Sequence, residues 1–121
     1  MSRITYLIAG LVAALVVVAP TTAGMSATKL NGTVGPGYTI SLKKGAAKVK
    51  TLTAGSYTIT VKDKSAMHNF RLKGPGVNKQ ITTVPFVGSK TVTVKLKKGK
   101  YTYVCDPHAA IPSMKGTFTV K

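Results

Sequence analysis

The stretch "YTYVCDPHAAIPSMKGTFTV", Tyr101–Val120, contains the only cysteine of the chain, Cys105, and one of its two histidines, His108. Polar and apolar residues alternate before Cys105 and again after Met114, and this period of two predicts two β-strands. The residues between the strands include two prolines and are predicted to form a loop. The sequence therefore predicts a thiol at the end of one strand, with an imidazole and a thioether in the loop that follows.

The same alternation recurs along the rest of the chain. Further strands are predicted over residues 38–44, 56–62 and 91–96, which are rich in the β-branched residues that favour a pleated sheet over a helix. Turns containing glycine or proline recur about every ten residues. We expect an all-β fold, a Greek-key β-sandwich or barrel of seven or eight short strands. The residues expected to share one face of their strands are Tyr38, Ile40 and Leu42; Tyr57, Ile59 and Val61; Val92, Val94 and Leu96; and Tyr101, Tyr103 and Cys105.

The first 23 residues have the layout of a secretory signal peptide. Arg3 precedes an almost wholly apolar run from Leu7 to Ala19, and small residues follow at Thr21–Ala23. The run is shorter than the roughly 20 residues that a membrane-spanning helix needs. We therefore expect residues 1–23 to be removed and residues 24–121 to form one exported domain, either periplasmic, extracellular or at the cell surface. An uncleaved membrane anchor is the alternative.

A single cysteine in an exported chain calls for an explanation, because Cys105 has no partner for an internal disulfide. It could link a dimer, remain an exposed thiol, fill the core as a small apolar residue, or bind a metal ion. The first two roles leave both histidines unexplained.

The chain is strongly basic, with 18 Lys+Arg against 2 Asp+Glu and a formal net charge of +16. This charge favours anionic partners such as an acidic protein, anionic cell-surface polymers or a membrane surface. Nucleic acid is disfavoured, because the chain has export features and its lysines are not interleaved with aromatic residues that stack on bases. The alternative is that most lysines simply keep the outer faces of the sheets soluble.

Four residues carry metal-binding chemistry: His68, Cys105, His108 and Met114. Cys105 and His108 are three residues apart across a turn that Pro107 helps to fix, so both can reach one ion. His68 comes from a separate segment, "SAMHNFRLKG", and can complete a trigonal His–Cys–His set. Met114 can then approach as a weak axial ligand, which gives the donor set of a blue-copper electron-transfer site.

At these residues the chain resembles the cupredoxins, the small blue-copper proteins that include plastocyanin and pseudoazurin. "MHNF" resembles the first-histidine segment of that family, "GKYTYVCDPH" its cysteine–histidine segment, and "MKGTFTV" the start of its last strand. The resemblance implies that the four residues named above bind one copper ion and that Asn69 ties the ligand loops together. Asp106 is a second residue that can orient the loop by hydrogen bonding.

The loop between His108 and Met114 departs from the family pattern. Its five residues, Ala109–Ser113, make it one residue longer than is usual in plastocyanin-like members. Loop length sets how closely the sulfur approaches, so the backbone carbonyl of Met67 is an alternative axial ligand and packing is an alternative role for Met114. Zinc, or a site that holds no metal, is the alternative to copper.

The resemblance implies an electron carrier without catalytic activity, in which one copper ion cycles between Cu(I) and Cu(II), and we expect it to be exported and monomeric. The expected partners are redox proteins, which the lysines would attract if those proteins are acidic. The apolar segment Ala109–Pro112, with Pro36 and Pro85, is expected to form a small docking patch.

Other functions use the same residues. A copper carrier or chaperone is the main alternative, and a structural β-sandwich with an idle site is a third. A multicopper oxidase or nitrite reductase is excluded by the size of the chain and its two histidines. A hydrolase with a cysteine nucleophile is poorly supported, because nothing near Cys105 indicates an oxyanion site.

Overall fold

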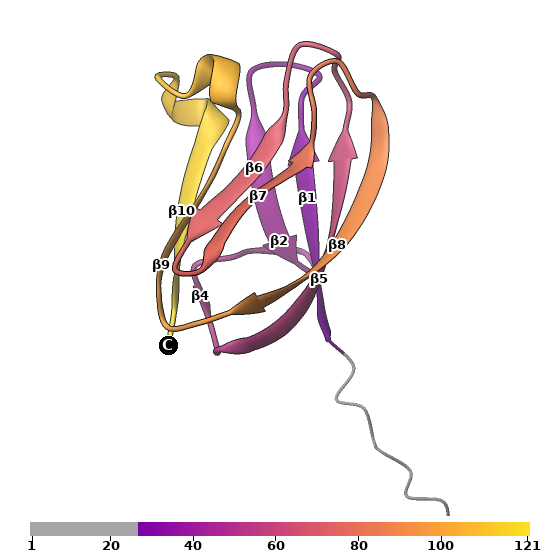
Figure 1. The fold of residues 1–121 in the computed structure, drawn as a ribbon. Coiled ribbons are helices and arrows are strands. Elements are labelled where there is room, and N and C mark those ends of the chain that lie inside the picture. Colours follow the sequence, from indigo (N-terminus) through magenta and orange to yellow (C-terminus); the bar gives the residue numbers. More distant parts are fainter. Residues whose placement is uncertain (1–26) are drawn as a thin grey trace, which may run out of the picture.

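Strands in two sheets dominate the computed structural model, which describes residues 27–121 (Figure 1). The predicted signal peptide, residues 1–23, lies outside the described residues. One sheet has the order β3-β2-β1-β5-β8 and is formed by β1 (Thr28–Val34), β2 (Ile40–Lys44), β3 (Ala47–Lys48), β5 (Gly55–Asp63) and β8 (Gly88–Leu96). The other has the order β4-β10-β9-β6-β7 and is formed by β4 (Thr51–Leu52), β6 (Phe70–Gly74), β7 (Val77–Thr82), β9 (Gly99–Val104) and β10 (Lys115–Val120). Two short 3₁₀ turns, η1 (Asp106–His108) and η2 (Pro112–Met114), connect β9 to β10.

The two sheets pack face to face as a sandwich, which confirms the predicted all-β fold (Figure 1). Eight of the ten described strands have five or more residues, as predicted, and β3 and β4 have two residues each. β1 runs parallel to β5 and β4 parallel to β10, whereas the other pairs are antiparallel. β6 also pairs with β9, so strands far apart in the sequence are neighbours, as in Greek-key connections.

The core between the sheets is filled by the apolar members of the alternating strands. On β5, Tyr57, Ile59 and Val61 are buried, while the threonines between them are only partly buried. The predicted alternation is therefore confirmed for this strand. Burial of apolar side chains in such a core is the main favourable contribution to folding.

Stacked aromatic rings form the centre of the second sheet's inner face. Phe70 stacks on Tyr103 with ring centroids 5.8 Å apart, and Tyr101 stacks on Phe118 at 5.3 Å. Gly116 makes room for the first pair, because a Cβ atom at this position would overlap the ring of Tyr103. The strand that follows the predicted ligand loop thus fits closely against the aromatic core.

One predicted strand begins later than its sequence pattern indicates. β2 begins at Ile40, and Tyr38 lies in the preceding loop with 49% of its surface exposed. The amide of Thr39 donates to the carbonyl oxygen of Gly37, so the chain turns before the strand starts. The expectation that Tyr38 shares a buried strand face with Leu42 is wrong, and its ring lies instead in the loops described below.

The two ends of the sandwich differ in what they carry. η1 and η2 lie at one end, together with the loops that follow β1, β5 and β7 (Figure 1). β1 runs toward this end and β10 runs away from it, so Thr28 and Val120 both lie at the opposite end (Figure 1). Among the residues that the structure describes, no helix is long and apolar enough to cross a membrane.

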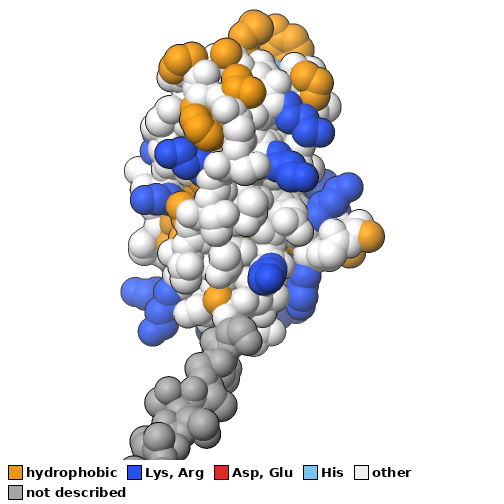
Figure 2. All heavy atoms as spheres, turned by 90° about the vertical axis from the view of Figure 1, so that its right-hand side faces the viewer, with side chains coloured by type: hydrophobic (Ala, Val, Ile, Leu, Met, Phe, Trp, Pro, Cys, Tyr) orange, Lys and Arg blue, Asp and Glu red, His pale blue; other side chains and the backbone are white. Residues whose placement is uncertain are grey.

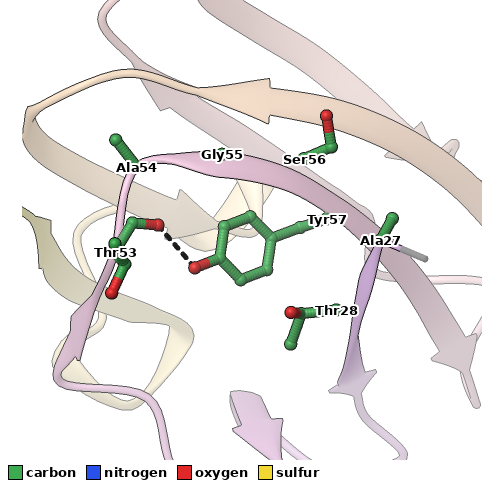
Figure 3. Close-up of a pocket in the computed structure, with 7 residues that line it drawn as sticks. All are labelled: Ala27, Thr28, Thr53, Ala54, Gly55, Ser56 and Tyr57. Carbon is green, nitrogen blue, oxygen red and sulfur yellow. Dashed lines mark hydrogen bonds between the residues drawn. The ribbon is translucent and has the colours of Figure 1, made fainter. Parts of the chain in front are cut away.

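The end that carries Thr28 contains a hollow of about 400 Å³, lined by Ala27–Thr28 and Thr53–Tyr57 (Figure 3). The ring of Tyr57 lies at its centre, and the tyrosine hydroxyl donates to the carbonyl oxygen of Thr53. The lining residues offer hydroxyl and backbone groups but no charged or metal-binding side chain. The metal-binding chemistry of the described residues therefore lies at the other end of the sandwich.

Candidate metal centre

Three predicted site residues meet at the end of the sandwich that carries η1 and η2. The Nδ1 atoms of His68 and His108 lie 3.1 Å apart. The Cys105 Sγ atom lies 3.7 Å from Nδ1 of His68 and 3.4 Å from Nδ1 of His108. Cys105 and His68 are buried, whereas His108 is partly exposed. The described residues contain this one group of three metal-binding side chains that could hold an ion.

The triangle formed by these three atoms has the size that a metal ion requires. Its edges of 3.1, 3.4 and 3.7 Å place its centre about 2.0 Å from each donor atom. Bonds from imidazole nitrogen and thiolate sulfur to divalent metals are about 2.0–2.3 Å long. The donor set, with one soft thiolate and two imidazoles, suits copper in both oxidation states. The residues therefore fit a mononuclear copper ion.

Backbone hydrogen bonds hold the loop that carries Cys105 and His108. The Cys105 amide donates to the carbonyl oxygen of Met114 at 3.0 Å, which closes the base of the loop. Within it, the His108 amide donates to Cys105 and the Ile111 amide to His108. Pro107 stands near the start of η1, where its fixed φ angle suits the turn. Because the chain turns between Cys105 and His108, their side chains point toward the same place.

A second loop positions His68. The carboxylate of Asp63 accepts from the amide of Ser65, and the carbonyl oxygen of Ser65 accepts from the amide of His68. Gly35, which has a φ of +74°, packs against the histidine, because a Cβ atom there would lie 3.2 Å from its ring. These contacts come from two segments: the hydrogen bonds hold the backbone of the loop after β5, and Gly35 packs against the ring of His68.

The two ligand loops are tied together by Asn69 and Asp106. The Asn69 side-chain amide donates to the Asp106 carboxylate at 2.8 Å, and the Asp106 backbone amide donates to the Asn69 side-chain oxygen at 2.7 Å. Both residues were predicted to orient the loops by hydrogen bonding, and these contacts confirm it. Asn69 is 2% exposed, so its bonds form largely away from water.

Arg71 extends this link. Its Nε atom donates to the Asp106 carboxylate at 2.7 Å, and its other nitrogens donate to Asn78 and Gln80 on β7. Burial alone would raise the pKa of Asp106, but hydrogen bonds from Arg71 and Asn69 and the charges of Arg71 and Lys73 hold that pKa below its ordinary value. Asp106 therefore stays ionised and keeps accepting from both partners.

Replacing Asn69 with alanine is expected to lower the free energy of unfolding by about 2 kcal/mol, because two hydrogen bonds are lost and the backbone amide of Asp106 loses its partner. Chemical denaturation of the metal-free protein measures this change. Asn78→Ala is the control, since Asn78 is exposed and its side-chain oxygen accepts a hydrogen bond from Nη1 of Arg71 rather than from a ligand loop. Equal losses in the two variants would contradict the tie between the loops.

Tyr38 is a part of this centre that sequence reasoning missed. Its ring meets His108 edge-on at 4.9 Å between centroids and His68 at 5.5 Å. The hydroxyl of Ser113 donates to the Tyr38 carbonyl oxygen, which joins the loop before β2 to η2. Arg71 was missed as well, although it is the only arginine that follows the predicted signal peptide. The sequence held one signal for a special role of Arg71: it is a single arginine among 16 lysines in residues 24–121.

The two candidate methionines lie in different surroundings. Met114 is fully buried at the end of η2, and its carbonyl oxygen is bonded to Cys105. Met67 is 59% exposed, so its thioether faces solvent to a large extent. This contrast favours Met114 over the Met67 sulfur as the axial donor. Which residues bind the ion remains a prediction.

Met114→Leu is expected to raise the reduction potential of the copper-loaded protein, because the thioether donates electron density that favours Cu(II). The shape of the side chain is nearly conserved, so the unfolding free energy should fall by less than about 1.5 kcal/mol. Voltammetry of this variant and of the control Met67→Leu measures the potential. An unchanged potential in Met114→Leu would assign Met114 to packing alone.

Comparison with known proteins identifies the family. A family profile described as copper-binding proteins of the plastocyanin/azurin family matches residues 38–121. The chain belongs to this family. The match includes every predicted ligand, and it confirms both the cupredoxin resemblance and copper as the expected metal. No curated protein sequence gave a match.

Solved structures of blue copper proteins share the cupredoxin fold of this chain. Rusticyanin from Thiobacillus ferrooxidans is 26% identical, with a TM-score of 0.53 over 77% of this chain and 76% of that chain. A methionine-to-glutamine variant of rusticyanin is 25% identical, with a TM-score of 0.56 over the same shares. Auracyanin A, a "blue" copper protein from Chloroflexus aurantiacus, is 21% identical, with a TM-score of 0.53 over 77% of this chain and 98% of that chain. The last likeness shows the fold alone.

Proposed function

We propose that this cupredoxin is an exported type 1 copper protein that carries single electrons between redox partners, with His68, Cys105, His108 and Met114 as the copper ligands. The supporting observation is the triangle of two imidazole nitrogens and one buried thiol sulfur, sized for a single ion. Cupredoxins carry electrons to partner proteins and are not themselves enzymes. We accordingly expect no catalytic activity.

Copper, when bound, supplies the one-electron couple, and the chain supplies its surroundings. Cys105 and His68 are buried, so their donor atoms are kept from water. Two backbone-bonded loops and the Asn69–Asp106 link hold the donors, which limits rearrangement when the charge of the ion changes. His108 is the partly exposed member of the set, so its ring is the shortest route between the centre and a docked protein.

The docking surface is the end of the sandwich around His108, as the sequence suggested. The large apolar residues most exposed in the described chain all lie in loops at this end: Tyr38, Met67, Val84 and Val87. Ala109, Ala110 and Pro112 are exposed beside them. Figure 2 shows apolar side chains gathered at this end, with lysines lower on the same face. Exposed apolar patches of this kind mark contacts with other proteins, and small ones suit rapid release.

The lysines are proposed to attract an acidic partner. Reduced protein should therefore be oxidised by hexacyanoferrate(III), an anion, at a rate that falls roughly tenfold between low salt and about 0.5 M salt. Stopped-flow absorbance measures the rate. A cationic cobalt complex is the control, and its rate should rise over the same range. A flat profile for both reagents would contradict electrostatic steering.

A copper carrier or chaperone remains the alternative, and redox cycling distinguishes the two functions. An electron carrier keeps its ion through both states, because the buried donors fit Cu(I) and Cu(II) alike. We expect the purified protein to bind one copper ion, to show an intense thiolate-to-copper band, and to recover that band over repeated reduction and oxidation in the presence of a Cu(I) chelator. Loss of copper to the chelator on reduction would favour the delivery function.

Residues 1–23 are proposed as a signal peptide and residues 24–121 as the mature domain, which would place the protein in the periplasm or outside the cell. Cupredoxin relatives are typically periplasmic or exported, which supports this location. A monomer is expected, because transient electron-transfer contacts are small. Intact-mass measurement and size-exclusion chromatography of protein exported by a host cell test both points.

A further inference from the structure

A groove of about 420 Å³ lies away from the metal centre, between the edge strands β7 and β8 of the two sheets. Three lysines line it, Lys79, Lys95 and Lys97, and all three are exposed. Val77 and Val94 form part of its lining and are half-buried. The lining therefore includes three lysines and two half-buried valines, and none of its residues carries a negative charge.

The hydroxyl of Tyr101 fixes one end of the groove. It accepts from the Lys97 amide at 2.9 Å and donates to the Pro75 carbonyl oxygen at 3.0 Å, so it joins the chain after β8 to the turn between β6 and β7. The tyrosine ring is fully buried, and Gly74 makes room for it because a Cβ atom there would overlap the ring. These two hydrogen bonds therefore join the two walls at this end of the groove.

The positive charge of the groove is not neutralised from within the described chain. The two acidic side chains of the chain lie elsewhere: Asp63 is 2% exposed beside the histidine loop, and Asp106 is paired with Arg71. Asn78, which also lines the groove, accepts from Arg71 through its side-chain oxygen. What it can offer a ligand is its NH₂ group, a further donor. The groove therefore presents donors and cations to an anion.

We propose that this groove binds an extended polymer that carries phosphate groups. Lysine ammonium groups act as point charges and are common phosphate ligands, since a tetrahedral phosphate can be approached from several sides. No aromatic residue lines the groove, so bases would have no stacking surface. The groove lies away from His108, so a bound polymer leaves the copper end free for redox partners.

Binding of fluorescent inorganic polyphosphate to the purified protein tests the proposal. The variant Lys79→Gln/Lys95→Gln/Lys97→Gln is expected to bind roughly tenfold more weakly than the unaltered protein. The control variant Lys43→Gln/Lys48→Gln/Lys50→Gln removes the same charge from exposed lysines around β2 and β3, at the opposite edge of the first sheet, and should lose about threefold or less. The amide NMR signals of Gly76 and Lys97 should shift on binding.

Equal weakening in the two triple variants would overturn the proposal, because net charge alone would then explain binding. Poly-glutamate of matched length that binds as tightly, with the same dependence on the groove lysines, would assign the groove to an acidic peptide and also overturn it. The visible copper band is recorded for each variant. A colourless protein that still binds polyphosphate through the groove would count against the proposed electron carrier and leave this inference standing.

Discussion

Cys105→Ser is expected to abolish the intense visible absorption of the copper-loaded protein. That absorption would come from charge transfer between a thiolate and Cu(II), and Cys105 is the only thiol in the chain. Cys105 is fully buried, but serine is close to cysteine in size, so the sandwich should still form. The oxygen is a harder and more weakly ionised donor, so Cu(I) affinity should also fall by several orders of magnitude.

Absorption spectroscopy during Cu(II) titration measures the first effect, and competition with a Cu(I) chelator measures the second. Ser113→Cys is an informative control, because it adds a second thiol to the same loop without changing the proposed ligands. It should keep the band of the unaltered protein. A Cys105→Ser protein that remains intensely coloured would show that the buried thiol is not a copper ligand, and the proposed function would fail with it.

Gly116→Ala is expected to destabilise the protein by about 3 kcal/mol, near the upper end for overpacking in a core. The added Cβ atom would lie well within van der Waals contact of the Tyr103 ring, which is itself stacked on Phe70. Both rings are fully buried, so neither can move into open space. Because Gly116 follows Met114 by two residues, the strain should also weaken copper binding.

Chemical denaturation gives the change in unfolding free energy, and copper titration gives the change in affinity. Gly37→Ala is the matched control: Gly37 lies in an exposed loop, and a Cβ atom there would meet nothing within 4 Å. Its effect should be below about 0.5 kcal/mol, as for most surface substitutions. Similar losses in both variants would mean that the close fit of β10 against the aromatic core contributes little.

The sequence alone predicts the strand pattern and the proximity of Cys105 to His108 well, because both depend on local spacing. The alternation around Tyr57, Ile59 and Val61 survives intact in β5, where each of these side chains is buried. Cys105 and His108 are close in sequence, so their convergence requires only one turn. The prediction of a link through Asn69 and Asp106 also holds, since each residue adjoins a proposed ligand.

The approach of His68 to Cys105 is harder to derive, because it depends on strand register. Antiparallel pairing of β6 with β9 places Arg71 opposite Val104, and this brings the residues before β6 beside those after β9. Alternation fits any register shifted by two residues equally well, so the sequence pattern does not choose among them. The predicted placement of Tyr38 in the strand is wrong for a related reason. Its spacing fits the strand, but the chain turns between Gly37 and Thr39.

The direction of the first and last strands has a practical consequence for electrochemistry. Thr28 and Val120 lie at the end of the sandwich opposite to η1 and η2 (Figure 1). A linker attached after β10 would hold the molecule on an electrode or a bead with the end that carries His108 turned toward the solution. Immobilisation chemistry aimed at the abundant lysine amines would instead attach the protein in many orientations, since those amines are spread over its sides.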